Sequence, residues 1–165
     1  MKKIAFVMGS DSDLDAHQGA FDVLKELEVP FEVRILSAHR TPKEACNFAE
    51  TAAAEGFDVI VASAGLAAHL GGVLAAHTLL PVVGVPMAGG ALQGVDALYS
   101  ISQMPGGVPV ASMGIGKAGA KNAALFAVRI LSLLDEDLRK RLAAWIKSEN
   151  DKVLAKDAAV RARFQ

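Results

Sequence analysis

The sequence is poor in cysteine and in aromatic side chains, and it carries no excess of either charge. Cys46 is the only cysteine among the 165 residues, which excludes an internal disulfide and a cysteine-based zinc site. The formal net charge is −1, and the 17 lysines and arginines are scattered along the chain. A nucleic acid or an anionic membrane surface is therefore not an expected partner.

The chain also lacks a long apolar run. Residues 4–8 are apolar and follow Lys2 and Lys3, as in a signal peptide, but the run ends at Gly9, too soon for the apolar region of such a peptide. No other segment is long enough to span a bilayer. We therefore expect a cytoplasmic protein.

Apolar residues and glycine, in contrast, are abundant. Hydrophobic residues make up 52% of the sequence, and there are 15 glycines besides. A chain of this length is most simply one domain, 1–165, with a sizeable core. The apolar share exceeds the usual one, which indicates that some surface is buried between subunits.

Short β-like runs alternate with helix-like runs along the chain. The runs typical of strands are rich in valine or isoleucine and lie at 3–8, 31–36, 58–63, 81–85 and 109–113. An alanine-rich helix is predicted from Lys117 to about Leu134, and a second one from about 135 to 156. Earlier in the chain, helical spacing relates Leu14, Phe21, Leu24 and Leu27.

This alternation predicts an α/β fold, a three-layer α/β/α sandwich of the flavodoxin-like type. Its five parallel strands would follow the order 2-1-3-4-5, with a core of about 3–134 and an extra C-terminal helix of about 135–156. In such a sheet, ligands bind beyond the carboxyl ends of the strands, where the loops after strands 1 and 3 diverge. The unusual segments of the sequence lie at those ends: GSDSD (9–13), SAHRTP (37–42) and SAGLAAHLGG (63–72).

The first of these segments, GSDSD, suits an anion. Gly9 permits a tight exit from the strand, and Ser10 or Ser12 can cap the following helix. The free N–H groups at the start of that helix attract an anion. A phosphate site and a plain capping turn both fit the segment. In the first case Asp13 would point away from the phosphate and accept hydrogen bonds from ribose hydroxyls.

The second segment continues into a helix. Thr41-Pro42-Lys43-Glu44 has the form of a capping box with proline at the first helical position, which predicts a helix start at Thr41. His39 and Arg40 then lie on the short link before that helix, at the ligand edge. Arginine suits bidentate recognition of phosphate, and histidine suits proton transfer near neutral pH. The alternative is a surface His–Arg pair.

The third segment is small and apolar, so that a flat ligand can approach its backbone. Within it, His69 is either a second polar contact or a histidine satisfied at a helix start. His17 and His77 lie in helical runs and are interpreted as structural or solvated. The four histidines show no HExxH or similar spacing, and no metal is expected.

Two other functions of this fold fit less well. A phospho-receiver signalling domain needs acidic residues after strand 1, which Asp11 and Asp13 supply, and an aspartate at the end of strand 3. Here Asp58 begins that strand and small residues end it. A flavin-binding electron carrier needs aromatic rings to stack on the isoalloxazine, and the chain has one tryptophan and one tyrosine.

Six segments carry a more specific signal: MGSDSD, SAHRTP, AAHL, LPVVGVP, GVDALYSISQMPGGVPVA and IGKAGAKNAAL. Together, over about residues 3–134, they resemble the class I 5-(carboxyamino)imidazole ribonucleotide mutases of purine biosynthesis. The resemblance implies a flavodoxin-like homo-octamer that uses no metal, organic cofactor or ATP. The implied reaction moves a carboxylate from the exocyclic nitrogen of the nucleotide to carbon 4 of its imidazole, which yields 4-carboxy-5-aminoimidazole ribonucleotide.

The resemblance also implies roles for individual residues. His39 would be the general acid/base, and His69 would lie over the imidazole and the carboxylate. The ribose phosphate would be bound by Ser10, Ser12, Asp13 and Arg40. The other residues that would line the substrate site are Ser37, Ala38, Gly65, Ala67 and Leu70.

The chain departs from the family pattern in three places. The third loop usually reads GGAAHLPG, whereas this chain has Leu66 in place of a glycine and Gly71 in place of the proline. Residues 88–90 are less polar than expected, and Asp11 stands where a lysine is common. The related class II carboxylases, which use aminoimidazole ribonucleotide and carbon dioxide directly, carry SAHK. Arg40 and the AAHL segment favour class I.

Overall fold

The structure is a computed structural model that describes residues 3–164. The chain divides into two compact units, Met1–Ala127 and Val128–Gln165. We refer to them as the sheet unit and the C-terminal unit. Within the described residues, none of the helices has the length and apolar character needed to cross a membrane.

The sheet unit is built on five parallel strands in the order β2-β1-β3-β4-β5. This confirms the predicted flavodoxin-like topology. The strands are β1 (Lys3–Met8), β2 (Phe31–Ile35), β3 (Phe57–Gly65), β4 (Val82–Met87) and β5 (Ala111–Ser112). β5 is shorter than predicted because Pro109 has no N–H for the ladder, and only Ala111 and Ser112 pair with β4.

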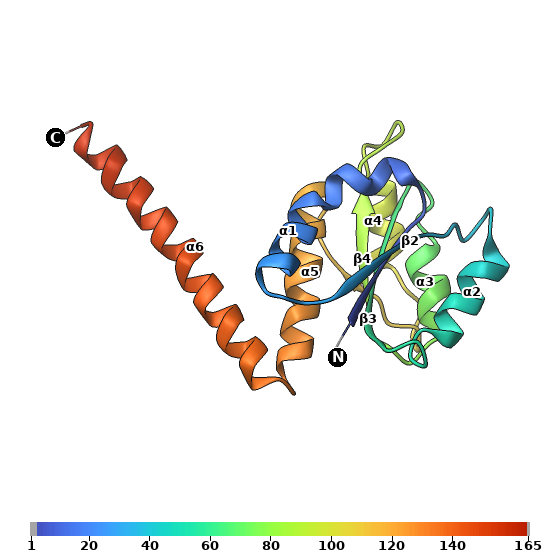
Figure 1. Ribbon diagram of the computed structural model, residues 1–165. Coiled ribbons are helices and arrows are strands. Elements are labelled where there is room, and N and C mark those ends of the chain that lie inside the picture. The colour runs from blue at the N-terminus through green and yellow to red at the C-terminus, as the bar shows by residue number, and fades with distance from the viewer. Residues whose placement is uncertain (1–2, 165) are drawn as a thin grey trace. The chain divides into compact units, whose positions relative to one another are not determined.

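Helices cover both faces of the sheet, as Figure 1 shows for α1 and α5 on one side and α2 and α3 on the other. α2, α3 and α4 pack on the face that presents Ala5 and Val7 of β1. The opposite face presents Phe6, whose ring meets Phe21 of α1 edge to face at 5.2 Å. The helical elements of this part are a 3₁₀ helix η1 (Asp11–His17), then α1 (Gln18–Glu26), α2 (Pro42–Thr51), α3 (Leu70–Ala76), α4 (Val95–Ser102) and α5 (Gly116–Ser132).

The core consists of buried strand residues and the inner faces of these helices. Phe21, Leu24 and Leu27 are buried as their spacing predicts. Each such side chain stabilises the fold by about 1.5–3 kcal/mol through removal from water. Leu14 was expected on the same stripe but is exposed, because it lies in η1, where residues recur every three positions and not every 3.6.

The C-terminal unit contains the end of α5 and the helix α6 (Glu136–Ala162). Asp135 caps α6, since its side chain accepts a hydrogen bond from the Leu138 N–H at 2.9 Å. The helix continues six residues beyond the predicted end at 156. The segment after 150 has no glycine or proline to stop it, and Lys147 pairs with Asp151 at 2.7 Å, one turn apart.

Candidate functional site

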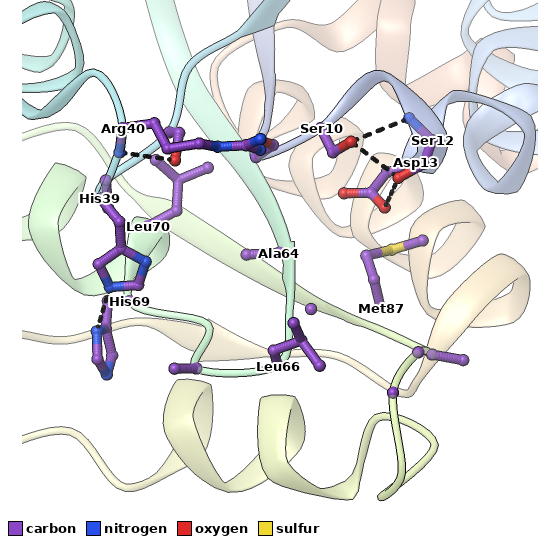
Figure 2. A pocket seen from close by; sticks show the side chains of 18 residues that line it. Ser10, Ser12, Asp13, His39, Arg40, Ala64, Leu66, His69, Leu70 and Met87 are labelled. Carbon is purple, nitrogen blue, oxygen red and sulfur yellow. Dashed lines mark hydrogen bonds between the residues drawn. The ribbon is translucent and has the colours of Figure 1, made fainter.

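A cavity of about 660 Å³ opens at the carboxyl ends of β1, β3 and β4, at the switch point of the sheet. The loops after β1, β2, β3 and β4 surround it (Figure 2). The structure brings all the residues proposed from the sequence to this cavity: Ser10, Ser12, Asp13, Ser37, Ala38, His39, Arg40, Gly65, Ala67, His69 and Leu70. Ala64 and Met87 also line the cavity, and the sequence analysis named neither of them.

The loop after β1 presents hydroxyl groups at the mouth of the cavity. Ser10 is the N-cap of η1, and its Oγ accepts hydrogen bonds from the Ser12 N–H at 3.3 Å and from the Ser12 hydroxyl at 2.9 Å. Asp13 is half-buried, and this burial raises the pKa of its carboxyl group, while the hydrogen bond from Ser12 opposes the shift. The loop therefore offers N–H and O–H donors at one edge and a desolvated carboxyl group beside them.

Arg40 connects the loop after β2 to the loop after β1. Its guanidinium donates a hydrogen bond to the Gly9 carbonyl at 3.1 Å, which brings the positive charge to the serine loop. In Figure 2 the Arg40 side chain extends toward Ser10. The guanidinium forms no ion pair with any residue in the described range 3–164. An anion at the serine loop would thus find a cation that no protein carboxylate already neutralises.

The capping box predicted at Thr41 does not form. Thr41 is the N-cap of α2, as expected, but its hydroxyl makes no capping bond to the helix. Instead Thr41 Oγ1 accepts from the Ser37 N–H at 2.9 Å and donates to the Ser37 carbonyl at 3.2 Å. Ser37 Oγ in turn accepts from the Arg40 N–H at 3.1 Å. These bonds close a tight loop that holds His39 and Arg40 at its tip.

His39 and His69 form a direct hydrogen bond across the cavity edge. His39 Nε2 lies 2.8 Å from His69 Nδ1, and the rings meet nearly edge to face, with centroids 4.9 Å apart. Both side chains are exposed, and the two outer nitrogens, His39 Nδ1 and His69 Nε2, have no partner among residues 3–164. They are free to meet a ligand.

The hydrogen bond constrains how the pair carries protons. Each neutral imidazole holds one hydrogen, and one of the two must lie in the shared bond. One outer nitrogen then carries the other hydrogen, and the remaining outer nitrogen has a lone pair. The neutral pair therefore always presents one proton donor and one proton acceptor. When one outer nitrogen gives up a proton and the other takes one up, the shared proton crosses the bond and these two roles are exchanged.

His17 is a buried histidine beside the site. Its Nδ1 lies 2.8 Å from the Asp13 carbonyl oxygen and its Nε2 lies 2.6 Å from Ser63 Oγ. Because the carbonyl only accepts, Nδ1 carries the hydrogen, and Nε2 accepts from the Ser63 hydroxyl. Burial lowers the pKa of His17, although the Asp13 carbonyl and carboxylate act in the opposite direction.

This contact bears out the structural interpretation of His17 and identifies its partner. The available signal was Ser63, a polar residue in the apolar run that follows Asp58 in strand β3, which needs a buried hydrogen-bond partner. His77, the other histidine interpreted as structural or solvated, is partly exposed and hydrogen-bonds Glu50 at 2.9 Å.

The loops after β3 and β4 form an apolar side of the cavity. Ala64, Gly65 and Leu66 come from the first, and Met87 ends β4 beside them. Leu66 has a φ of +55°, a conformation that costs an L residue roughly 1–2 kcal/mol. The cavity thus combines a polar edge of serines and arginine, a histidine pair, and an apolar wall. Among residues 3–164, no three His, Cys, Asp or Glu side chains gather as a metal site.

Comparison with known proteins points to the same part of the chain. The sequence model of the family described as AIR carboxylase matches residues 3–152. The N5-carboxyaminoimidazole ribonucleotide mutase of Escherichia coli K12 is 53% identical over 152 residues, which cover 92% of this chain and 90% of the relative. The mutase of the same name from Bacillus subtilis is 55% identical over 139 residues, 84% of this chain and 86% of the relative.

A solved structure shares the architecture. The crystal structure of Treponema denticola PurE is 26% identical and superposes with a TM-score of 0.83, covering 96% of this chain and 98% of that one. The match to the family model includes all four loops around the cavity, because residues 3–152 contain every residue that lines it.

Proposed function

Because the chain belongs to the AIR carboxylase family, we propose that it is a mutase of purine biosynthesis that converts 5-(carboxyamino)imidazole ribonucleotide to 4-carboxy-5-aminoimidazole ribonucleotide. The substrate is the compound named N5-carboxyaminoimidazole ribonucleotide in the names of the relatives. The observation that carries the proposal is the hydrogen-bonded pair His39–His69 in a cavity whose other edge is built of donors for a phosphate. We place the enzyme in the cytoplasm, as the sequence led us to expect.

In this proposal the nucleotide lies with its phosphate at the serine loop. Ser10 and Ser12 supply hydroxyl and N–H donors, and Arg40 supplies the positive charge. Asp13 accepts hydrogen bonds from the ribose hydroxyls. The desolvation that raises the pKa of its carboxyl group makes such bonds favourable, since they replace lost water. The imidazole then extends over the small residues Ala38, Gly65 and Ala67 toward the histidines.

The chemistry has two halves that balance in protons. In the first, the bond from the exocyclic nitrogen to the carboxyl carbon breaks, its electron pair stays on nitrogen, and the nitrogen takes up a proton as carbon dioxide leaves. In the second, carbon 4 attacks the carbon dioxide and then loses its proton, which restores the aromatic ring. The enzyme gives one proton and receives one, so that it ends each cycle in its initial state.

We assign these two proton transfers to His39, with His69 as its partner. His39 acts as an acid in the first half and as a base in the second. The hydrogen bond at 2.8 Å gives His69 the means to return or withdraw the shared proton between the two halves. His69, at the start of α3, lies over the imidazole and the transferred carboxylate, where its outer nitrogen is free to bond.

A direct assay tests the activity. Purified protein is incubated with 5-(carboxyamino)imidazole ribonucleotide in bicarbonate-free buffer, and 4-carboxy-5-aminoimidazole ribonucleotide is measured by chromatography. We expect turnover without added bicarbonate. A parallel reaction contains aminoimidazole ribonucleotide and bicarbonate. Product in this second reaction alone would assign the protein to the direct carboxylases and contradict the mutase proposal.

We further propose that the enzyme is a homo-octamer, as the resemblance to class I mutases implies. Exposed apolar side chains at α4 support an assembly, since Leu92, Val95 and Tyr99 lie three and four residues apart and remain open to solvent in the single chain. Light scattering at micromolar concentration tests this proposal. A monomeric mass would contradict it.

A further inference from the structure

The serine loop, residues 9–17, consists largely of an uncommon element. Its helix η1 (Asp11–His17) is a 3₁₀ helix of seven residues. Helices of this kind rarely exceed three or four residues, because their hydrogen bonds are poorly aligned. Ser10 caps η1, and Ser12 and Asp13 lie in its first turn, together at the end of the cavity opposite the histidine pair in Figure 2. The groups proposed to bind the phosphate and the ribose therefore lie on an element that needs support from the rest of the fold.

Ser63 of β3 anchors the serine loop at both of its ends. The Ser63 carbonyl accepts a hydrogen bond from the Gly9 N–H at 2.9 Å, where the chain leaves β1. The Ser63 hydroxyl donates to His17 Nε2 at 2.6 Å, where η1 ends. From His17 a further bond returns into η1, since Nδ1 donates to the Asp13 carbonyl at 2.8 Å. One strand residue thus fixes the start and the end of the loop, and through His17 also its middle.

Packing holds the His17 ring in the orientation that these bonds require. The side chains of His17 and Ser63 are both buried. Phe21 of α1 stacks on the His17 ring, with centroids 6.0 Å apart and planes at 27°. Phe6 of β1 meets the same ring edge to face at 5.9 Å. A side chain fixed by packing on its faces and by hydrogen bonds at both nitrogens is a rigid support for the residues that it contacts.

We propose that His17 is a positioning residue, which holds the serine loop against β3 in the conformation that binds phosphate and ribose and thereby sets the affinity of this chain for its substrate. This inference rests on the proposed function, which places the phosphate and ribose at this loop. His17 and Ser63 do not line the cavity, so that they act through the loop and not by contact with the nucleotide. A loop that is ordered before binding lowers the free energy that the ligand must spend on ordering it.

The proposal predicts a rise in KM with little change in kcat. His39 and His69 come from other loops, so that the proposed proton transfers do not depend on η1. The phosphate and ribose contacts are the same in the substrate and in the transition state, and loss of such uniform binding raises KM alone. A histidine that only stabilised the fold would change the fraction of folded protein and leave KM unchanged.

The experiment cuts the bridge from either end. His17→Asn keeps an N–H group near the place of Nδ1 but is too short to reach Ser63, and Ser63→Ala removes the hydroxyl. In both variants we expect KM for 5-(carboxyamino)imidazole ribonucleotide to rise by ~10-fold, while kcat per folded molecule changes by less than ~3-fold. The double variant should raise KM little beyond the larger single effect, because the same hydrogen bond is lost.

Val59→Ala is the matched control for lost stability. Val59 is buried in β3, on the same face of the strand as Ser63 and four residues before it, and it does not line the cavity. Its truncation should lower Tm at least as much as Ser63→Ala, because it leaves a cavity in the core. KM should stay within ~2-fold of the natural value. If KM rose equally in Val59→Ala and in Ser63→Ala, general loosening and not the bridge would explain the effect, and the proposal would be overturned.

A second measurement locates the loss of affinity without turnover. Ribose 5-phosphate carries the two groups assigned to the serine loop and lacks the imidazole. Calorimetry should show that its Kd rises by ~10-fold in His17→Asn and in Ser63→Ala, in step with KM, and stays unchanged in Val59→Ala. An unchanged Kd in the two bridge variants would contradict the proposal, even if KM rose.

The outcomes distinguish the inference from the function on which it rests. If the natural protein binds ribose 5-phosphate but does not convert the substrate, the mutase proposal fails and the Kd values still test His17. If it does not bind ribose 5-phosphate, the phosphate and ribose do not lie at this loop and the inference is overturned. If it is an active mutase and the bridge variants keep its KM and Kd, the positioning role is overturned and the mutase function stands. A joint rise in the bridge variants alone supports both.

Discussion

Two histidine hydrogen bonds lie in and beside the same cavity, and their surroundings differ. His17 is buried, and both of its ring nitrogens have fixed partners, the Asp13 carbonyl and the Ser63 hydroxyl. His39 is exposed and bonds only to His69 within the described chain, so that one nitrogen on each ring is open to a ligand. The lengths are similar, 2.6 Å for His17–Ser63 and 2.8 Å for His39–His69.

The difference supports the proposed roles of a structural histidine, His17, and a proton-transferring histidine, His39. A histidine whose two nitrogens are committed within the fold holds its neighbours in place and has no site to offer. A histidine paired at one nitrogen keeps the other available and can pass a proton through its partner. Gly9 joins the two regions, because its N–H donates to the Ser63 carbonyl at 2.9 Å and its carbonyl accepts from Arg40.

The largest effect is expected when the proposed catalytic pair, His39–His69, is broken. His39→Asn should lower kcat by ~10²–10⁴-fold, because a positioned general acid and base is lost. Affinity for the product, measured by calorimetry, should change little, and so should Tm, since the side chain is exposed. Steady-state kinetics with 5-(carboxyamino)imidazole ribonucleotide gives the comparison. Near-normal kcat would exclude His39 from the proton transfers.

Breaking the buried pair should instead affect stability. His17→Ala leaves a cavity and removes the partners of Ser63 and of the Asp13 carbonyl, so that unfolding should become easier by ~2–4 kcal/mol. Chemical denaturation measures this change. Ser63→Ala is the companion variant and should cost ~1–3 kcal/mol, because it removes little volume but leaves the buried His17 Nε2 without its donor.

The contrast between the pairs would be lost if His17→Ala behaved like His39→Asn. We expect kcat per folded molecule to fall by less than ~10-fold in His17→Ala, because the proposed mechanism passes no proton through His17. A stable His17→Ala variant with abolished turnover would place His17 in the chemistry.

Arg40 tests the connection between the two regions. Arg40→Ala should weaken substrate binding by ~1.5–3 kcal/mol, because a charge-assisted contact to phosphate is lost. KM should rise while kcat changes less. Arg40→Lys keeps the charge but not the bond geometry, and it should recover only part of the affinity. Unchanged KM in both variants would place the phosphate elsewhere.

The smallest effect concerns acid stability. Burial lowers the pKa of His17, so the unfolded chain binds a proton that the folded chain rejects in the interval below the usual histidine value of about 6.5. The neutral ring therefore contributes stability above that value, and the contribution is lost as the pH falls through the interval. His17→Gln, which does not titrate, should show a shallower loss of stability below pH ~6.5. Parallel pH profiles for the two proteins would contradict this.

The sequence predicted the sheet with few errors, and it predicted which loops surround the cavity. Valine-rich runs alternating with helical runs fit the flavodoxin-like strand order, and the rule for parallel sheets then indicates which loops meet. His39 and Arg40 could be chosen because they come directly before a proline-initiated helix. These arguments need only local patterns and topology, and both are visible in a single sequence.

The contacts within the site could not be predicted, because they depend on distances across the fold. Ser63 is 46 residues from His17, and His69 is 30 residues from His39. The predicted capping box at Thr41 was wrong for a similar reason, since the backbone of Ser37 competes for the same hydroxyl. The positive φ of Leu66 and the approach of its side chain to Gly90 depend on how two loops meet, and no local pattern shows this.

The central claim is that the carboxyl group travels within the cavity, under the control of the exposed histidine pair. The most direct measurement uses 5-(carboxyamino)imidazole ribonucleotide labelled with carbon-13 in its carboxyl group, in buffer with excess unlabelled bicarbonate. The account predicts that most of the 4-carboxy-5-aminoimidazole ribonucleotide formed in early turnover retains the label. A product whose carboxyl carbon matches the unlabelled bicarbonate pool would contradict it.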